Sequence, residues 1–147
     1  MNKLDIYGRE MMPVTELSKK NKYYIPQERQ LELTHFCRQY YIWKLKYKEI
    51  EALHARPLDI YLSNFPYRSV EELQEKKDIY YKRFNLVDTA LKKTSDRPEI
   101  QEMILGGITT GKSYDFMSDF ETMPVSRNEY YKLYHKFFWV LDKIRDT

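Results

Sequence analysis

Apolar residues recur at alternating spacings of three and four along two long stretches of this chain, and this periodicity constrains the fold more than any other feature. The first stretch follows Pro26, the second precedes Asp96, and Pro57 and Pro66 lie between them. Such spacing gives an α-helix one continuous apolar face. The two stripes are Leu33, Phe36, Tyr40, Trp43, Tyr47 and Ile50, and Val70, Leu73, Lys77, Tyr80, Phe84, Val87 and Leu91.

Neither stripe can be buried alone, so we expect the two helices to form a long antiparallel helical hairpin over residues 25–95. The first helix should run unbroken for about seven turns. Pro26 suits its first position, where a missing N–H costs nothing. Ser69 and Glu72 form a capping box at the start of the second helix. An intermolecular coiled coil is the competing use of the same stripes.

A third helix is expected to begin near Pro98, with Asp96 as its N-cap and Glu99 completing the capping box. A short apolar face follows, and Gly106-Gly107 is expected to end the helix. No segment of the chain alternates cleanly between apolar and polar residues, as a half-buried strand would. The sequence therefore predicts an all-α protein.

Two more helices are expected near the C-terminus. Ser113 can cap a short one, Pro124 breaks the chain after it, and Ser126 with Glu129 forms the capping box of a longer one. The apolar face of this final helix comprises Tyr130, Leu133, Tyr134, Phe137, Leu141 and Ile144. Residues 96–147 thus have the layout of a helix-turn-helix unit. We divide a single compact domain into a flexible or loosely docked arm (1–24), the hairpin and this unit.

Composition limits the function classes. A chain of 147 residues with 25 basic and 22 acidic side chains has a net charge of +3, which is modest for a non-specific nucleic-acid binder. Cys37 is the only cysteine, which excludes an internal disulfide and a multi-cysteine zinc site. No apolar run has the length of a signal peptide or a membrane span. We therefore expect a cytoplasmic protein.

One string matches a catalytic motif. The residues from Gly106 to Ser113 fit the phosphate-loop pattern G-x-x-x-x-G-K-[ST]. A phosphate loop must follow a buried strand, however, and the preceding residues are helix-like, so we expect no nucleotide site. The histidines, His35, His54 and His135, lack metal-ligand spacing, and Cys37 is expected to be a buried apolar residue. We expect no enzyme activity, no cofactor and no metal.

The final helix carries side chains suited to DNA on the side opposite its apolar face. Arg and Asn near the start of such a helix can read base edges, and lysines suit phosphates. The candidate DNA-binding residues are Arg127, Asn128, Tyr131, Lys132, His135 and Lys136. The acidic residues Asp115, Asp119 and Glu121 precede this helix and oppose DNA binding. The competing interpretation is that the last helices close the core, with Tyr131 and Trp139 in a protein interface.

Five segments together resemble a family of small proteins encoded by phages and prophages of low-GC Gram-positive bacteria. They are Tyr23-Tyr24-Ile25-Pro26, 32–40, 108–114, 123–131 and 136–141. The C-terminal part is similar in plan to RinA-like and ArpU-like phage regulators, whose last helices resemble a sigma-factor region that contacts promoter DNA. The resemblance implies that the stretch from Ile108 to Ser113 leads into a helix-turn-helix.

We therefore expect a phage transcription regulator that binds duplex DNA through this unit and acts in the host cytoplasm. The hairpin is expected to mediate dimerisation or a polymerase contact. The alternative is a phage protein that binds and inhibits a host or defence protein without touching DNA, since many tyrosines and a near-neutral charge also fit a protein interface. A continuous basic stripe on the last helix would favour DNA. An acidic or aromatic patch there would favour a protein.

Overall fold

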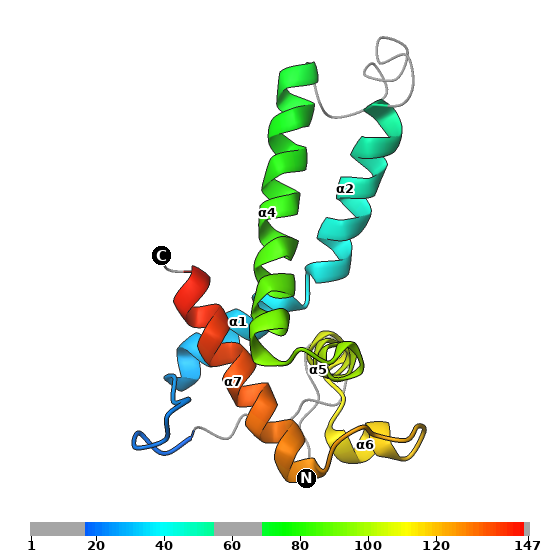
Figure 1. The fold of residues 1–147 in the computed structure, drawn as a ribbon. Helices are drawn as coiled ribbons and strands as arrows, with labels where there is room; N and C mark the ends of the chain where they lie inside the picture. The colour runs from blue at the N-terminus through cyan, green and yellow to red at the C-terminus, as the bar shows by residue number, and fades with distance from the viewer. Residues whose placement is uncertain (1–16, 55–68, 146–147) are drawn as a thin grey trace.

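Every regular element of the part of the chain that the structure describes is an α-helix. The computed structural model describes residues 17–54 and 69–145 (Figure 1). The helices are α1 (Gln27–Cys37), α2 (Tyr40–His54), α4 (Val70–Thr94), α5 (Pro98–Thr110), α6 (Tyr114–Ser118) and α7 (Arg127–Arg145). The expectation of an all-α chain is confirmed. Within these ranges no helix combines the length and apolarity needed to cross a bilayer.

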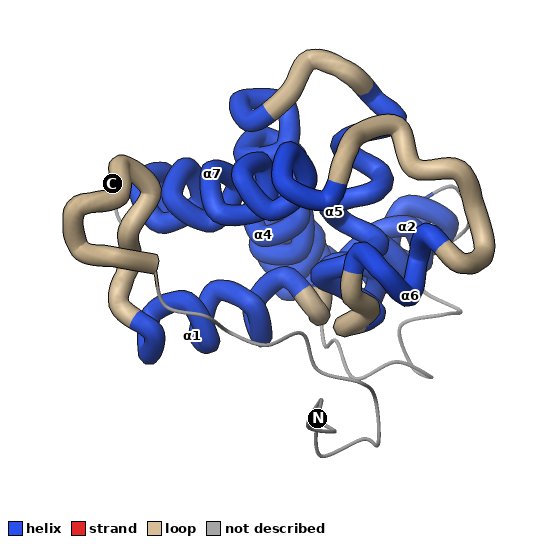
Figure 2. Tube along the Cα trace, turned by 90° about the horizontal axis from the view of Figure 1, so that it is seen from below, coloured by secondary structure: helices blue, strands red, loops and turns tan. Residues whose placement is uncertain are grey.

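The helices form a narrow pair above a wider base. Helices α2 and α4 lie side by side and run in opposite directions (Figure 1). The lower end of α4 continues into the base, where α1, α5 and α7 gather around it (Figure 2). Helix α6 lies at the bottom beside the start of α7, far from the tip of the α2–α4 pair. Pro57 and Pro66, which were expected to break the chain, lie outside the described residues.

The prediction of one unbroken helix over the first stripe is wrong. The chain turns at Arg38 and Gln39 between α1 and α2, where the Arg38 N–H donates to the carbonyls of Phe36 and Thr34. The stripe stays buried across the break, but α1 packs on α5 and α7 whereas α2 packs on α4. One straight helix could not contact both sets of partners. Pro26 precedes the first turn of α1 as its N-cap residue rather than occupying the first helical position.

Two groups of buried side chains hold the molecule together. The main core joins α1, the first turn of α2, the lower half of α4, α5, α6 and α7, and includes the fully buried Leu33, Val87, Ile104, Phe137 and Phe138. A small second cluster of Ile50, Leu53 and Leu73 lies further up, between α2 and α4. The upper part of the pair therefore has little apolar packing of its own.

The C-terminal end of α5 also differs from expectation. Gly106 and Gly107 do not end this helix, which runs on to Thr110 and stops at Gly111, whose φ of 74° is left-handed. At the other end the N-cap residue is Arg97, with no side-chain cap, so the expected cap at Asp96 is also wrong. Gly107 is buried against α6 and α7. A β-carbon at this position would overlap the Tyr130 hydroxyl and would lie 3.2 Å from the Met117 methyl group. Close packing on α7, rather than chain termination, explains this glycine.

The other predicted helix starts are confirmed. The Ser69 hydroxyl accepts a hydrogen bond from the Glu72 amide at 3.1 Å, and Ser113 accepts one from Phe116 at the same distance. Ser126 accepts one from the Glu129 amide at 3.3 Å. Each bond satisfies an amide that the helix itself leaves unpaired.

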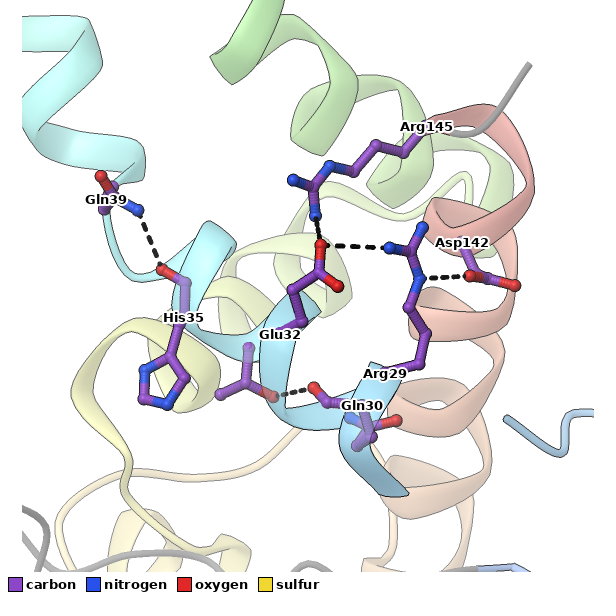
Figure 3. Close-up of polar contacts among 8 residues, drawn as sticks. Arg29, Gln30, Glu32, His35, Gln39, Asp142 and Arg145 are labelled. Carbon is purple, nitrogen blue, oxygen red and sulfur yellow. Dashed lines mark hydrogen bonds and ion pairs between the residues drawn. The ribbon is translucent and has the colours of Figure 1, made fainter. Parts of the chain in front are cut away.

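Charged side chains tie α1 to α7. Arg29 donates to Asp142 at 2.6 Å and to Glu32 at 3.1 Å, and Arg145 donates to the same Glu32 oxygen at 2.9 Å (Figure 3). The Arg145 guanidinium also lies over the Phe36 ring, 4.2 Å from its centre. Acidic and basic side chains thus alternate along the contact between α1 and α7, and these ion pairs fix the position of α7 relative to α1.

Candidate nucleic-acid interface

Tyrosine side chains hold α6, the following turn and α7 as one unit. The Tyr114 hydroxyl donates to the Val125 carbonyl in the turn at 2.7 Å. In the opposite direction, the Tyr131 hydroxyl accepts a hydrogen bond from the Tyr114 amide at 3.3 Å. The Tyr114 ring also packs on Tyr130, with ring centres 5.6 Å apart. These contacts were not predicted, because the many tyrosines carry no periodicity that would pair them.

The predicted DNA-binding residues of α7 do not share one environment. Asn128 and Lys132 are exposed, and Lys136 is half-buried beside the same outward stripe. Tyr131 is half-buried and serves the contact with α6, so its hydroxyl is already engaged. The structure therefore leaves Asn128, Lys132 and Lys136 as a polar and basic stripe at helical spacing over the first three turns.

Arg127 lies at the edge of this stripe. Its guanidinium is 3.5 Å from the Asp115 carboxylate of α6, with side-chain exposures of 61% and 73%. It also lies 5.4 Å from the centre of the Tyr131 ring. An ion pair this exposed is weak, because water solvates both charges well. Arg127 is thus oriented by α6 but can exchange its partner at little cost.

His135 is half-buried on α7, and its ring packs edge-on against Tyr134 at 5.3 Å between ring centres. Burial lowers the pKa of His135 below its ordinary value of 6.5. The imidazole is therefore neutral at pH 7. It can donate or accept a hydrogen bond, but it adds no positive charge to the stripe.

An acidic and aromatic patch lies just beyond the C-terminal end of α6. Phe120 is 77% exposed, more than any other large apolar residue in the described ranges, and Asp119 and Glu121 flank it with exposed carboxylates. A shallow groove of about 300 Å³ adjoins it, lined by Gly106, Thr110, Lys112, Phe116, Met117, Phe120 and Glu121. The basic stripe is therefore not continuous across α6 and α7.

The phosphate-loop string does not form a phosphate loop. Gly106 and Gly107 belong to α5, so their amides lie within a helix, and the exposed Lys112 lies 5.3 Å from the Phe116 ring. The described residues hold no strand to precede such a loop.

The described residues form no nucleophile site at Cys37 and no metal site at the histidines. Cys37 is fully buried, and burial raises its thiol pKa, so it is not a thiolate at pH 7. Within residues 17–54 and 69–145, no three metal-ligating side chains gather, and His35 is exposed on α1. The side chain of His54 lies outside the part of the chain that the structure describes.

A second surface is exposed on the outer side of α2. Tyr41, Ile42 and Leu45 are 57%, 54% and 60% exposed, and all lie on the side of α2 that faces away from α4. Leu45 lies four residues after Tyr41 and three after Ile42, the two spacings at which side chains are neighbours on a helix, so the three form one patch. Such patches commonly mark contacts with another protein.

Comparison with known proteins adds no family: no family model, curated protein or solved structure matches this chain.

Proposed function

We propose that this protein is a phage-type transcription regulator that binds duplex DNA with α6, the turn and α7 as a helix-turn-helix. The single observation that carries the proposal is the stripe of Asn128, Lys132 and Lys136 on the outward side of α7, at the end of the molecule opposite the α2–α4 tip. A helix that enters a major groove reads bases with the residues of its first turns.

Each side chain has a role suited to its position. Asn128 and Arg127 lie in the first turn, where Asn and Arg can hydrogen-bond to base edges. Lys132 and Lys136 follow along the helix and suit phosphate oxygens. Tyr131 positions α6 rather than DNA, and His135 contributes a neutral hydrogen-bonding group. The sequence-specific part of this interface is therefore small.

The test measures fluorescence anisotropy of a labelled random-sequence duplex as salt concentration rises. Arg127→Ala plus Lys132→Ala should weaken binding, and it should make the plot of log affinity against log salt shallower by about one unit, because the phosphate contact of Lys132 is lost. Lys76→Ala plus Lys82→Ala removes the same charge from exposed positions on α4. This control should bind like the wild type. Equal losses in both variants, or no binding by the wild type at low salt, would refute the proposal.

A second candidate function is binding to a host protein, and the patch around Phe120 favours it. An exposed aromatic ring beside a groove is the usual anchor of a protein interface, and its acidic neighbours suit a basic partner. Affinity capture with matched baits separates the two functions. A partner lost by Phe120→Ala but kept by the α7 double variant supports protein binding, and the reverse pattern contradicts it.

We also infer that the α2–α4 pair mediates self-association through the outer patch of α2. Tyr41, Ile42 and Leu45 are each more than half exposed, so two copies of this patch can bury their apolar surface against each other. A dimer of this kind would carry two α7 helices, and the second would bind as a tethered site.

A further inference from the structure

A turn with three lysines precedes α1, and the structure gives it a defined conformation. Lys19, Lys20 and Lys22 are exposed. The Asn21 amide donates to the Ser18 carbonyl at 2.8 Å, and the Asn21 side-chain oxygen accepts from the Tyr23 amide at 2.9 Å. The segment 18–24, here called the lysine turn, thus holds its cations on a folded backbone.

The lysine turn is docked on α7. Ile25, the residue after it, is 8% exposed and belongs to the main core. The Tyr23 ring packs edge-on against Trp139 of α7, with ring centres 5.5 Å apart. Two anchors therefore hold the turn beside the outward side of α7, although the two segments lie at opposite ends of the sequence.

Cations from both segments meet at this contact. The Lys22 ammonium lies 5.6 Å from the centre of the Tyr23 ring, and the Lys143 ammonium lies 3.5 Å from the centre of the Trp139 ring. Trp139 and Lys143 share the outward face of α7 with Lys132 and Lys136, because the four positions are spaced by four, three and four residues. Lysines of two distant segments thus lie along one surface.

Few acidic groups offset this charge. Glu129 is exposed in the first turn of α7, three residues before Lys132. Asp142 adjoins the surface but pairs with Arg29 at 2.6 Å, and Glu28 is exposed in the first turn of α1. The lysine turn itself contains no acidic residue. Its surface therefore has the charge that a phosphate backbone requires.

We propose that the lysine turn is a phosphate clamp for duplex DNA, placed beside the groove that the first turns of α7 enter. Tyr23 covers Trp139, so direct base contacts end near Lys136 and the turn meets the backbone beyond. Lys19, Lys20 and Lys22 contact phosphates and contribute affinity without sequence preference. This inference rests on the proposed DNA binding by α7.

The test compares two triple variants in the anisotropy assay across a salt series. Lys19→Gln/Lys20→Gln/Lys22→Gln should lower affinity about tenfold and reduce the salt slope by about two to three units, since each phosphate contact contributes about 0.9. The matched control, Lys46→Gln, Lys76→Gln and Lys82→Gln together, removes the same charge from exposed positions on the α4 side of α2 and on α4. Its slope should equal that of the wild type.

The outcomes separate the two proposals. A wild-type slope in the lysine-turn variant overturns the clamp and leaves α7 binding standing, whereas absence of wild-type binding overturns both. Equal losses in the two triple variants would reveal a general charge effect and would also overturn the clamp. Tyr23→Ala keeps every lysine but removes the ring that docks the turn on Trp139. It should weaken binding with circular dichroism unchanged, and wild-type affinity would contradict the role of docking.

Discussion

The contact between Gly107 and Tyr130 gives the sharpest test of how α5 packs on α7. A β-carbon at Gly107 would overlap the Tyr130 hydroxyl and would lie 3.2 Å from the Met117 methyl group. The Tyr130 ring is 0% exposed and cannot move aside. Overpacking of this kind costs about 3 kcal/mol at the upper end of its range. Alanine recovers about 1 kcal/mol of helix propensity, so Gly107→Ala should destabilise the protein by about 2 kcal/mol.

The neighbouring glycine is the matched control. A β-carbon at Gly106 meets nothing within 4 Å, so Gly106→Ala should stabilise the protein by about 0.5 to 1 kcal/mol through helix propensity alone. Thermal unfolding followed by circular dichroism separates the two variants. The melting temperature should fall by about 6 °C for Gly107→Ala and rise for Gly106→Ala.

A double-mutant cycle identifies the cause. The buried Tyr130 hydroxyl has no hydrogen-bond partner among the described residues, and burial raises its pKa, so Tyr130→Phe should cost little. Gly107→Ala combined with Tyr130→Phe should then recover most of the lost stability, because the overlapping oxygen is gone. A double variant no more stable than the sum of the single effects would refute the reasoning. Wild-type stability of Gly107→Ala alone would do the same.

Three other predictions concern surface charge, pH and assembly. Since burial lowers the pKa of His135, the unfolded chain binds the proton more tightly than the folded chain, and the free energy of unfolding should fall as pH drops through about 6.5. In urea titrations His135→Gln should flatten this fall. A variant with the pH profile of the wild type would contradict the prediction. Asp115→Asn removes the acid beside Arg127 and should raise duplex affinity about twofold to fivefold in the anisotropy assay; lower affinity would contradict an available Arg127. Leu45→Glu places a charge in the exposed α2 patch and should convert a dimer to a monomer, as measured by light scattering after size exclusion. Lys82→Glu is the control at an exposed position outside the patch. A monomeric wild type would contradict self-association.

Local sequence signals predicted the fold where one residue type decides the backbone. Ser69, Ser113 and Ser126 each cap the helix expected of them. Of the apolar face predicted for α7, Leu133 and Ile144 are half-buried and the other four residues are buried. The break between α1 and α2 could not be predicted, because no glycine or proline lies at Arg38 and Gln39. Tertiary packing on two different partners imposes that turn.

The candidate site was predictable only in its residue types. Spacing placed Asn128 and Lys132 on the outward side of α7, where the structure exposes them. Spacing did not indicate that the Tyr131 hydroxyl would accept a hydrogen bond from the Tyr114 amide, or that the Tyr23 ring would pack on Trp139. Both contacts join residues far apart on the chain, and no local pattern specifies such pairs.

The same geometry explains how an acidic α6 is compatible with the proposed DNA binding by α7. Asp115 is the acid of α6 that pairs with α7, and it is matched by Arg127 at 3.5 Å, an exposed pair that a phosphate can replace. Asp119 and Glu121 flank Phe120 beyond the end of α6, whereas Lys132, Lys136 and Lys143 continue along α7 toward the lysine turn. Negative charge is thus concentrated at one end of the interface and positive charge at the other. A duplex that follows α7 toward the lysine turn moves away from the acids, so the charge gradient favours one orientation of the protein on DNA.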